Sequence, residues 1–234
     1  MGRALVMVVV GAGCGAHVPR APDGPPPEIE LRHAFTVPGE SFEYAAELRG
    51  LPVGRVVTAV GTPGWVEGQQ ALIVRSRGQS TGMVALLADL TWEQTTTLDV
   101  TRGGVILSRE ELWSSLAGEQ HHETDATEPG ALDVHAAIGA LRAWRSQPGQ
   151  AARMVVCFGH ACFPLALRDA GHGFLVSAGE PAVRYEGVAE ADEKVAFTGW
   201  VSDDVARVPL RFEAELPVFG RLVMELAHYT APAD

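Results

Sequence analysis

The chain has 234 residues, of which 47% are hydrophobic, and its formal net charge is −11. This length and apolar fraction suit one large domain or two small ones with a sizeable core. The negative charge, without a cluster of Lys and Arg, excludes nucleic acids and anionic lipid surfaces as partners, because both would repel the chain.

The N-terminus predicts export and lipidation. Arg3 precedes an apolar run over 4–10, and the small residues 11–13 lead into Cys14. This order is that of a signal peptide, and a cysteine directly after it resembles a bacterial lipoprotein signal. We therefore expect residues 1–13 to be removed and Cys14 to carry acyl chains, with an ordinary secretory signal as the alternative. The apolar run is too short to span a bilayer, which needs about 20 residues.

The residues after Cys14 predict where the protein is held. Gly15 follows the cysteine, whereas an aspartate at this place retains lipoproteins at the inner membrane in well-studied systems. We therefore expect a lipid anchor in the outer membrane, facing the periplasm, with a soluble periplasmic protein as the alternative. The segment 14–34 contains three prolines at 25–27 and is predicted to be an extended tether, because it cannot pack a core.

Alternation of apolar and polar residues predicts a single β-rich domain over 35–231. In 206–216, apolar residues such as Leu210 and Phe212 alternate with charged ones, as in antiparallel strands with one buried face. Turn-forming residues separate the segments, for example at 169–173. The predicted strands cover 42–49, 53–60, 70–77, 92–100, 104–110, 151–157, 162–168, 172–178, 183–190, 194–201, 206–216 and 220–229.

Two segments predict helices, at about 80–89 and 131–146. Asp133 favours the N-terminus of the second helix, and Pro148 and Gly149 end it. Val134, Ala137, Ile138 and Leu141 fall on one apolar face, which Trp144 extends. The sequence therefore predicts a mainly β, α+β fold, namely a curved antiparallel sheet or open barrel of about eleven strands with two short helices.

Cys157 and Cys162 are predicted to form a disulfide. Thiols of exported proteins tend to oxidise, and Cys14 is reserved for lipid, which leaves these two cysteines as the pair. Four residues separate them, so a β-hairpin would place them opposite each other. The alternatives are a metal site with His160 and a catalytic redox pair. Zinc sites usually bring a second cysteine pair, and redox pairs usually have two intervening residues, so we expect no metal and no cofactor.

Four segments resemble the bacterial family called domain of unknown function 3108. Its opening is similar to 39–60, GESFEYAAELRGLPVGRVVTAV, and its short helix and following strand to 80–100, STGMVALLADLTWEQTTTLDV. Its middle is similar to the helix with the PGQ exit at 148–150, and its close to 199–229, GWVSDDVARVPLRFEAELPVFGRLVMELAHY. The resemblance covers most of the chain beyond the signal. It implies an exported protein of mainly antiparallel β structure, without an established activity or catalytic residues.

Several other reactive side chains are expected to have structural roles. His121, His122 and Glu123 lie in a polar stretch that is predicted to be a solvated loop. Asp203 and Asp204 are expected to form a turn, because aspartate is a favoured turn residue.

Two tryptophans and one further histidine could in principle serve a ligand. Trp92 and Trp200 could stack on a sugar or a lipid, but packing in the core or at a strand edge is favoured. His228 is expected to be a hydrogen-bonded interior histidine. We assign a catalytic role to none of these residues.

Together these features predict a lipid-anchored periplasmic envelope protein that binds an apolar or amphipathic envelope component, such as a lipid, or a protein partner. A structural or assembly protein with a filled interior is the alternative. A hydrolytic enzyme is less favoured, because its site would have to be assembled from distant residues such as His121, Asp203 and His228. An apolar cavity of about 300 Å³ or more would favour ligand binding.

Overall fold

The structure is a computed structural model that describes residues 26–29, 36–87, 89–115, 118–125, 130–158, 161–190, 195–216 and 220–232, without the side chains at 83, 87, 122–125 and 216. The predicted signal peptide and Cys14 lie outside the described residues. Of the predicted tether, 26–29 are described, and the N–H of Ile29 donates to the carbonyl of Arg153 at 3.0 Å.

Within these ranges, fourteen strands form one continuous sheet, and two helices accompany it. The fold is therefore mainly β with two short helices, as predicted, although the strands outnumber the prediction. The strands are β1 (Ser41–Leu48), β2 (Leu51–Val60), β3 (Gly64–Val66), β4 (Gln69–Ser80), β5 (Leu90–Asp99), β6 (Val105–Ser114), β7 (Gly118–Asp125), β8 (Ala131–Leu132), β9 (Ala151–Phe158), β10 (Ala161–Leu175), β11 (Glu180–Ala189), β12 (Ala196–Ser202), β13 (Pro209–Leu216) and β14 (Gly220–Thr230). The helices are α1 (Gly82–Leu87) and α2 (Val134–Ala143). Among the described residues, no helix has the length and apolar character needed to cross a membrane.

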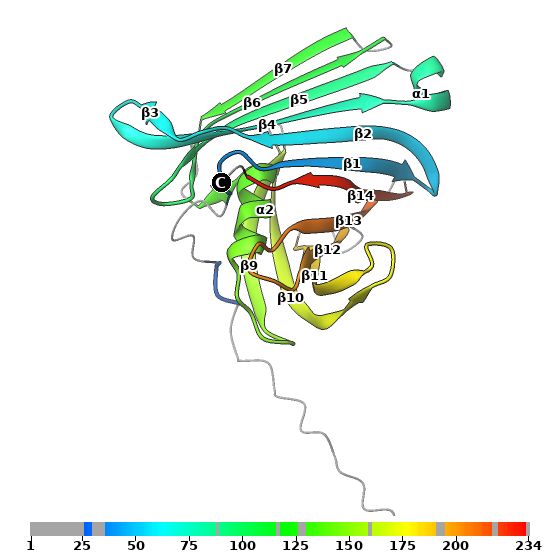
Figure 1. Cartoon of the computed structure of the whole chain (residues 1–234). Coiled ribbons are helices and arrows are strands. Elements are labelled where there is room, and N and C mark those ends of the chain that lie inside the picture. Colours follow the sequence, from blue (N-terminus) through cyan, green and yellow to red (C-terminus); the bar gives the residue numbers. More distant parts are fainter. Residues whose placement is uncertain are drawn as a thin grey trace, which may run out of the picture.

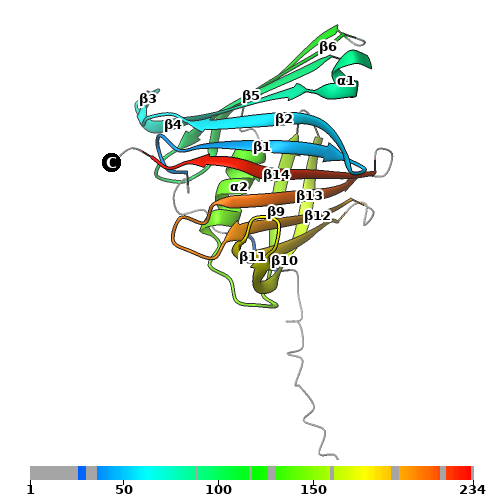
Figure 2. The same cartoon turned by 45° about the vertical axis from the view of Figure 1, so that its right-hand side comes forward.

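The sheet is open and strongly curved. Its strands follow the order β7-β6-β5-β4-β2-β1-β14-β13-β12-β11-β10-β9-β8, and β3 pairs with β4 beside this order. Neighbouring strands are antiparallel, except that β8 runs parallel to β9. The order ends at β7 on one side and at β8 on the other, so the described strands do not close into a ring. Figures 1 and 2 show the sheet wrapping around α2, which crosses its concave face near one end of the strands.

A capping aspartate and small side chains place α2 against the sheet. The carboxylate of Asp133 accepts a hydrogen bond from the N–H of Ala136 at 2.9 Å and so caps the first turn. The helix was predicted to begin at about 131, but residues 131–132 form β8 and α2 begins at Val134. Ala136, Ala137 and Ala140 are buried in α2. Because these side chains are small, the helix backbone can approach the strands closely. The core around it comes from β2, β4, β5, β8, β9, β10, β11 and β12.

One strand continues where a turn was predicted. Residues 169–173 were expected to form a turn, but β10 runs through them. A bulge between Asp169 and Gly171 absorbs the glycine-rich stretch. Gly171 adopts a φ of 105°, and its N–H donates to the Asp169 carboxylate at 2.7 Å. Glycine can adopt this positive φ without strain. The chain therefore bulges at Gly171, and β10 continues.

One strand also forms where a loop was predicted. The polar stretch around His121 was expected to be a solvated loop, but it belongs to β7, which pairs with β6 from Ser114↔Gly118 to Leu107↔Asp125. Polar side chains suit an edge strand, because they discourage pairing with other chains. Alternation of apolar residues could not reveal this strand, since it has none.

Two buried arginines hold α2 in its position. The guanidinium of Arg142, at the end of α2, forms an ion pair with Glu40, which directly precedes β1. It also donates to the carbonyls of Ala206 and Arg207 at 3.0 Å. Both side chains of the ion pair are at most 1% exposed. The helix end is therefore connected to β1 and to the β12–β13 loop at once.

Arg207 completes this network from the other side. Its guanidinium donates to the carbonyls of Arg142 and Trp144, at 3.3 and 3.1 Å, and to the hydroxyl of Tyr185. The Tyr185 hydroxyl in turn donates to the carbonyl of Trp144 at 2.9 Å. The carbonyls that α2 leaves unpaired at its C-terminal end thus find partners in the loop and in β11.

We expect Arg142→Leu to lower the free energy of unfolding by about 3–5 kcal/mol, because it leaves the Glu40 carboxylate buried without its partner. The control is Arg168→Leu, which removes an ion pair with Glu186 whose arginine side chain is 61% exposed; it should cost less than about 1 kcal/mol. Urea denaturation of the two variants measures the difference. Equal losses would contradict the role assigned to the buried pair.

Candidate functional site

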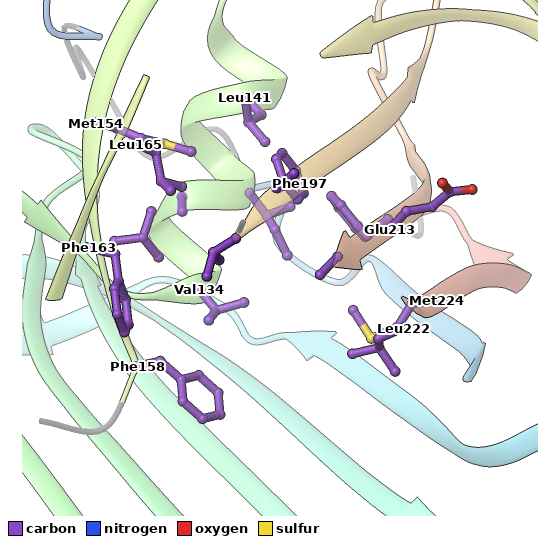
Figure 3. A pocket seen from close by; sticks show the side chains of 17 residues that line it. Val134, Leu141, Met154, Phe158, Phe163, Leu165, Phe197, Glu213, Leu222 and Met224 are labelled. Atoms are coloured by element: carbon purple, nitrogen blue, oxygen red, sulfur yellow. The ribbon is translucent and has the colours of Figure 1, made fainter. Parts of the chain in front are cut away.

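An apolar cavity of about 320 Å³ lies on the concave face of the sheet beside α2. Its walls come from α2, β9, β10, β12, β13 and β14. The predicted apolar face of α2 forms one wall, with all four of its residues, Val134, Ala137, Ile138 and Leu141. Figure 3 shows Val134 and Leu141 on this wall, with Phe163, Phe197 and Met224 among the side chains that surround the space.

The cavity exists because α2 crosses only part of the strands. A helix with its side chains is about 10 Å wide, whereas a strand of ten residues, such as β2 or β11, is about 33 Å long. The core residues around α2 lie near one end of these strands, for example Val60 at the end of β2 and Val183 near the start of β11. Toward the other end, α2 leaves apolar residues of β9, β10, β12, β13 and β14 uncovered.

Glu213 is the one charged residue among those that line the cavity, and its carboxylate points away from the cavity. Figure 3 shows the carboxylate pointing away from the other labelled side chains. It forms ion pairs with Arg211, at 2.8 Å, and with Arg221. The surface that a ligand would meet in the cavity is therefore apolar throughout, which suits a hydrocarbon and gives no handle to a polar substrate.

Two exposed phenylalanines mark the mouth of the cavity. Phe158, at the end of β9, is 53% exposed, and Phe163, near the start of β10, is 42% exposed. Both line the cavity. Large apolar side chains at this exposure are unfavourable in water, so their position at an apolar opening favours contact with an apolar ligand.

The predicted disulfide connects the two strands at this mouth. Cys157 and Cys162 are directly opposite each other in the β9–β10 hairpin, and the structure joins their sulfur atoms. Successive side chains of a strand point to opposite faces. The disulfide therefore lies on the other face from Phe158 and Phe163 and takes no space from the cavity.

A cluster of buried polar side chains lies under the N-terminus of α2. The ring of His135 contacts the hydroxyls of Ser76, at 2.7 Å from Nε2, and Thr96, at 2.6 Å from Nδ1. The Thr96 hydroxyl donates to the Asp133 carboxylate. Because that hydroxyl has one proton to give, it accepts from Nδ1–H. The Ser76 hydroxyl also lies 2.6 Å from that of Thr58. When Thr58 donates to Ser76, Ser76 donates to Nε2 and the ring is neutral, which is the form that burial favours.

This cluster anchors the helix and does not belong to the cavity. Ser76, Thr96, Asp133 and His135 are each at most 6% exposed, and none of them lines the apolar cavity. Burial lowers the pKa of His135, against the smaller opposing influence of the Asp133 charge. The sequence analysis missed His135. The sequence feature that could have revealed this cluster is the pair of polar residues Asp133 and His135 at the helix start. Small polar residues at inward positions of β4 and β5, namely Ser76 and Thr96, complete the feature.

The reactive residues considered above are distributed over different elements. The ring of His121 lies 3.2 Å from the carboxylate of Glu119 on β7, and Asp203 binds His172 at 2.8 Å. The side chains of His122 and Glu123 lie outside the described residues, as does His160. Among the described residues, no group of three or more His, Cys, Asp and Glu side chains could hold a metal ion.

His228 was predicted to be an interior histidine, and this prediction was wrong. Its side chain is exposed. In the pairing of β1 with β14, Glu43 lies opposite His228 and the next residue, Tyr44, lies opposite Leu226, so the register shifts between them. The extra residue reverses the alternation along β14, which turns His228 outward and Tyr229 inward.

The turn at Asp203 and Asp204 and the packing of the tryptophans were predicted correctly. Asp204 accepts hydrogen bonds from the Ser202 hydroxyl at 2.8 Å and from the N–H of Arg207 at 2.9 Å, as a turn residue does. Trp92 is half-buried in the sheet. Trp200 is half-buried as well, with the guanidinium of Arg211 lying 5.8 Å from its ring centre.

A hydrolase-type motif lies at Gly78–Gly82, although the sequence was predicted to contain none, and this prediction was wrong. The residues GQSTG match G-x-S-x-G, and Ser80 stands between a strand, β4, and a helix, α1. Its hydroxyl accepts the N–H of Leu90 at 3.0 Å and so fixes the start of β5. In α/β-hydrolases the motif also needs a histidine base. Among the described histidines, the ring of His135 bonds to Ser76 and Thr96, and that of His172 bonds to Asp203.

Comparison with known proteins identifies no family. No family model matches the sequence, and no curated protein is similar to it. Among solved structures, it is similar to a β-barrel-like protein of domain of unknown function DUF1849 from Brucella abortus, with a TM-score of 0.49 and 7% identity over 84% of this chain and 99% of that chain. This likeness is too distant to indicate a function. The resemblance to domain of unknown function 3108 stays a prediction.

We expect the neutral, buried His135 to make stability depend on pH. Since its pKa is lower in the folded chain than in the unfolded chain, the unfolded chain binds more protons as the pH falls through the ordinary histidine range near 6.5. Folding should therefore weaken from pH 7 to pH 5, with a contribution of at most about 1.4 kcal/mol per pH unit.

The substitution His135→Gln should lower the free energy of unfolding at pH 7 and flatten its dependence on pH. His228→Gln, at an exposed position of β14, serves as the control and should keep the original slope. Urea denaturation at several pH values measures both. An unchanged slope in His135→Gln would show that another group causes the pH dependence.

Proposed function

We propose that this chain is a lipid-anchored periplasmic protein that binds an apolar or amphipathic component of the cell envelope in the cavity beside α2. The observation that carries the proposal is the cavity itself, which measures about 320 Å³ and is lined by apolar side chains. Cavities that bind small molecules have volumes from about 300 Å³ and mostly apolar walls. A structural protein would be expected to fill this space, because empty apolar volume costs stability.

The chemistry of the cavity supports a ligand with a hydrocarbon part. The lining offers no charged group, since the Glu213 carboxylate is engaged outside by Arg211 and Arg221. The mouth is formed by Phe158 and Phe163, so the apolar surface extends from the interior to the solvent. A polar head group would remain outside, while an apolar chain would enter. We therefore infer an acyl-chain ligand rather than a sugar or a nucleotide.

The proposed anchor is tested first, because it also provides material for binding experiments. The substitution Cys14→Ser removes the thiol that would carry the acyl chains, so the chain should leave the membrane fraction and appear in the soluble periplasmic fraction. The double variant Cys157→Ser and Cys162→Ser is the control for loss of a cysteine elsewhere and should stay in the membrane. Continued membrane association of Cys14→Ser would refute the lipid anchor.

The cavity is tested with a fluorescent fatty acid, dansyl-undecanoic acid, titrated into the Cys14→Ser chain. We expect saturable binding with a blue-shifted emission. Ala214→Trp should raise the Kd at least tenfold, or about 1.4 kcal/mol, because Ala214 lines the cavity and an indole would fill it. Ala59→Trp introduces the same side chain at an exposed position of β2 and should leave the Kd unchanged. Binding that resists Ala214→Trp would place the ligand elsewhere.

A further inference from the structure

We propose that the ligand is a glycerolipid with two acyl chains, and that a second cavity on the concave face receives the second chain. This inference rests on the proposed function, because it assigns the class of ligand for the same site. The second cavity has a volume of about 300 Å³, which is close to the volume of the first cavity. It is lined by residues of β1, β2, β4, β5 and α1, among them Ala46, Val56, Val84 and Leu90.

The two cavities are neighbours on the same face of the sheet. Ala46 of β1 lines the second cavity, and it lies directly opposite Met224 of β14, which lines the first. One strand further, Gly54 of β2 lies opposite Ala46 and also lines the second cavity. The floor therefore continues from the first cavity into the second without a charged side chain between Met224 and Ala46.

A pair of stacked rings stands between the cavities. Trp92 lines the second cavity and Phe158 lines the first, and their ring centres are 6.3 Å apart with nearly parallel planes. The indole N–H of Trp92 donates to the Glu110 carboxylate at 2.6 Å. A Cβ at Gly78 would come within 3.2 Å of the Trp92 ring, so the glycine makes room for it. The partition is thus fixed in place from the side of the sheet.

Both cavities lie toward the same end of the strands. The pairing of Leu48 with Leu51 and of Phe158 with Ala161 places the β1–β2 and β9–β10 turns at the end opposite to the α2 network. Helix α1, between β4 and β5, belongs to this end too, because Gly54 pairs with Ser80 just before it. Exposed apolar side chains gather there, namely Leu51, Leu86, Leu90, Phe158 and Phe163, which are 36–82% exposed.

A two-chain lipid matches this arrangement better than a single chain. A methylene group is about as large as a water molecule, which occupies roughly 30 Å³, so each cavity has room for roughly ten carbons. A single chain would leave one cavity empty. Two chains joined at a glycerol would lie on either side of the Trp92–Phe158 pair, with the head group outside at the shared end. The formal charge of −11 favours an uncharged or zwitterionic head group.

The experiment compares two zwitterionic probes below their micelle concentrations by titration calorimetry with the full chain carrying Cys14→Ser. Dioctanoyl-phosphatidylcholine has two chains, and octanoyl-lysophosphatidylcholine has one chain and the same head group. We expect one molecule of either probe per chain, with the two-chain lipid binding at least tenfold more tightly, because a second chain leaves water.

Filling the second cavity should remove this advantage. Val84→Trp introduces an indole from α1, and Val53→Trp does so from β2; each should bring the two-chain lipid within about threefold of the lysolipid and leave lysolipid binding unchanged, which also shows that the variant is folded. Val205→Trp, at a position that is 85% exposed, is the matched control and should change neither affinity. Ala214→Trp should weaken both probes.

The possible failures are distinguishable. If the two-chain lipid binds no more tightly than the lysolipid, or keeps its advantage in both Val84→Trp and Val53→Trp, the two-chain proposal is wrong while ligand binding stands. If two lysolipids bind per chain with equal affinity, the cavities are independent sites and the glycerolipid is again wrong. If neither probe binds the parent chain, the proposed function itself fails.

Discussion

The C-terminal end of α2 is held by a buried ion pair. Arg142 extends from the end of the helix to the Glu40 carboxylate beside β1 and to backbone carbonyls of the β12–β13 loop. If α2 moved, each of these groups would be buried without a partner, which costs several kcal/mol. The pair itself adds little net stability, because desolvation offsets much of the attraction. The effect of the Arg142–Glu40 pair is to favour one position of the helix. That position in turn sets the curvature of the strands around the helix.

That position decides which part of the interior is filled. Around Ala140 and Leu141 the helix meets the strands and completes a packed core, whereas Val134, Ala137, Ile138 and Leu141 also face the apolar cavity. The concave face therefore has a filled half and an open half. Open apolar walls lack contact partners and are unfavourable, and this is why we propose an occupant for the space. The position of α2 thus connects the buried charges at one end of the strands to the proposed binding cavity at the other.

The sequence could predict the features that depend on local pattern. Alternation along residues such as Leu210 and Phe212 predicts strands, the helical spacing of Val134, Ala137, Ile138 and Leu141 predicts α2, and the spacing of Cys157 and Cys162 predicts the disulfide. It could not predict β7, which has no apolar alternation, or the continuous β10, where a bulge at Gly171 replaces a turn. The apolar face of α2 was predicted, but its partner was not. Whether the apolar face of α2 meets a strand or a cavity depends on where Arg142 holds the helix. The local sequence pattern does not show that Arg142 is buried.

The disulfide explains how the mouth of the cavity can keep its shape. At the tip of the hairpin, β9 has β10 on one side, whereas the described β8 pairs with it only at Val155 and Val156. Apart from the stacking of Phe158 on Trp92, the tip would therefore be held by a single neighbour without the bond between Cys157 and Cys162. With it, Phe158 and Phe163 are ordered before a ligand arrives, so binding loses less conformational entropy. Because the bond needs an oxidising compartment, a chain kept in a reducing one would retain the core around Arg142 but lose the rigid mouth. The proposed export and the proposed ligand binding would therefore be coupled through the hairpin rather than through the core.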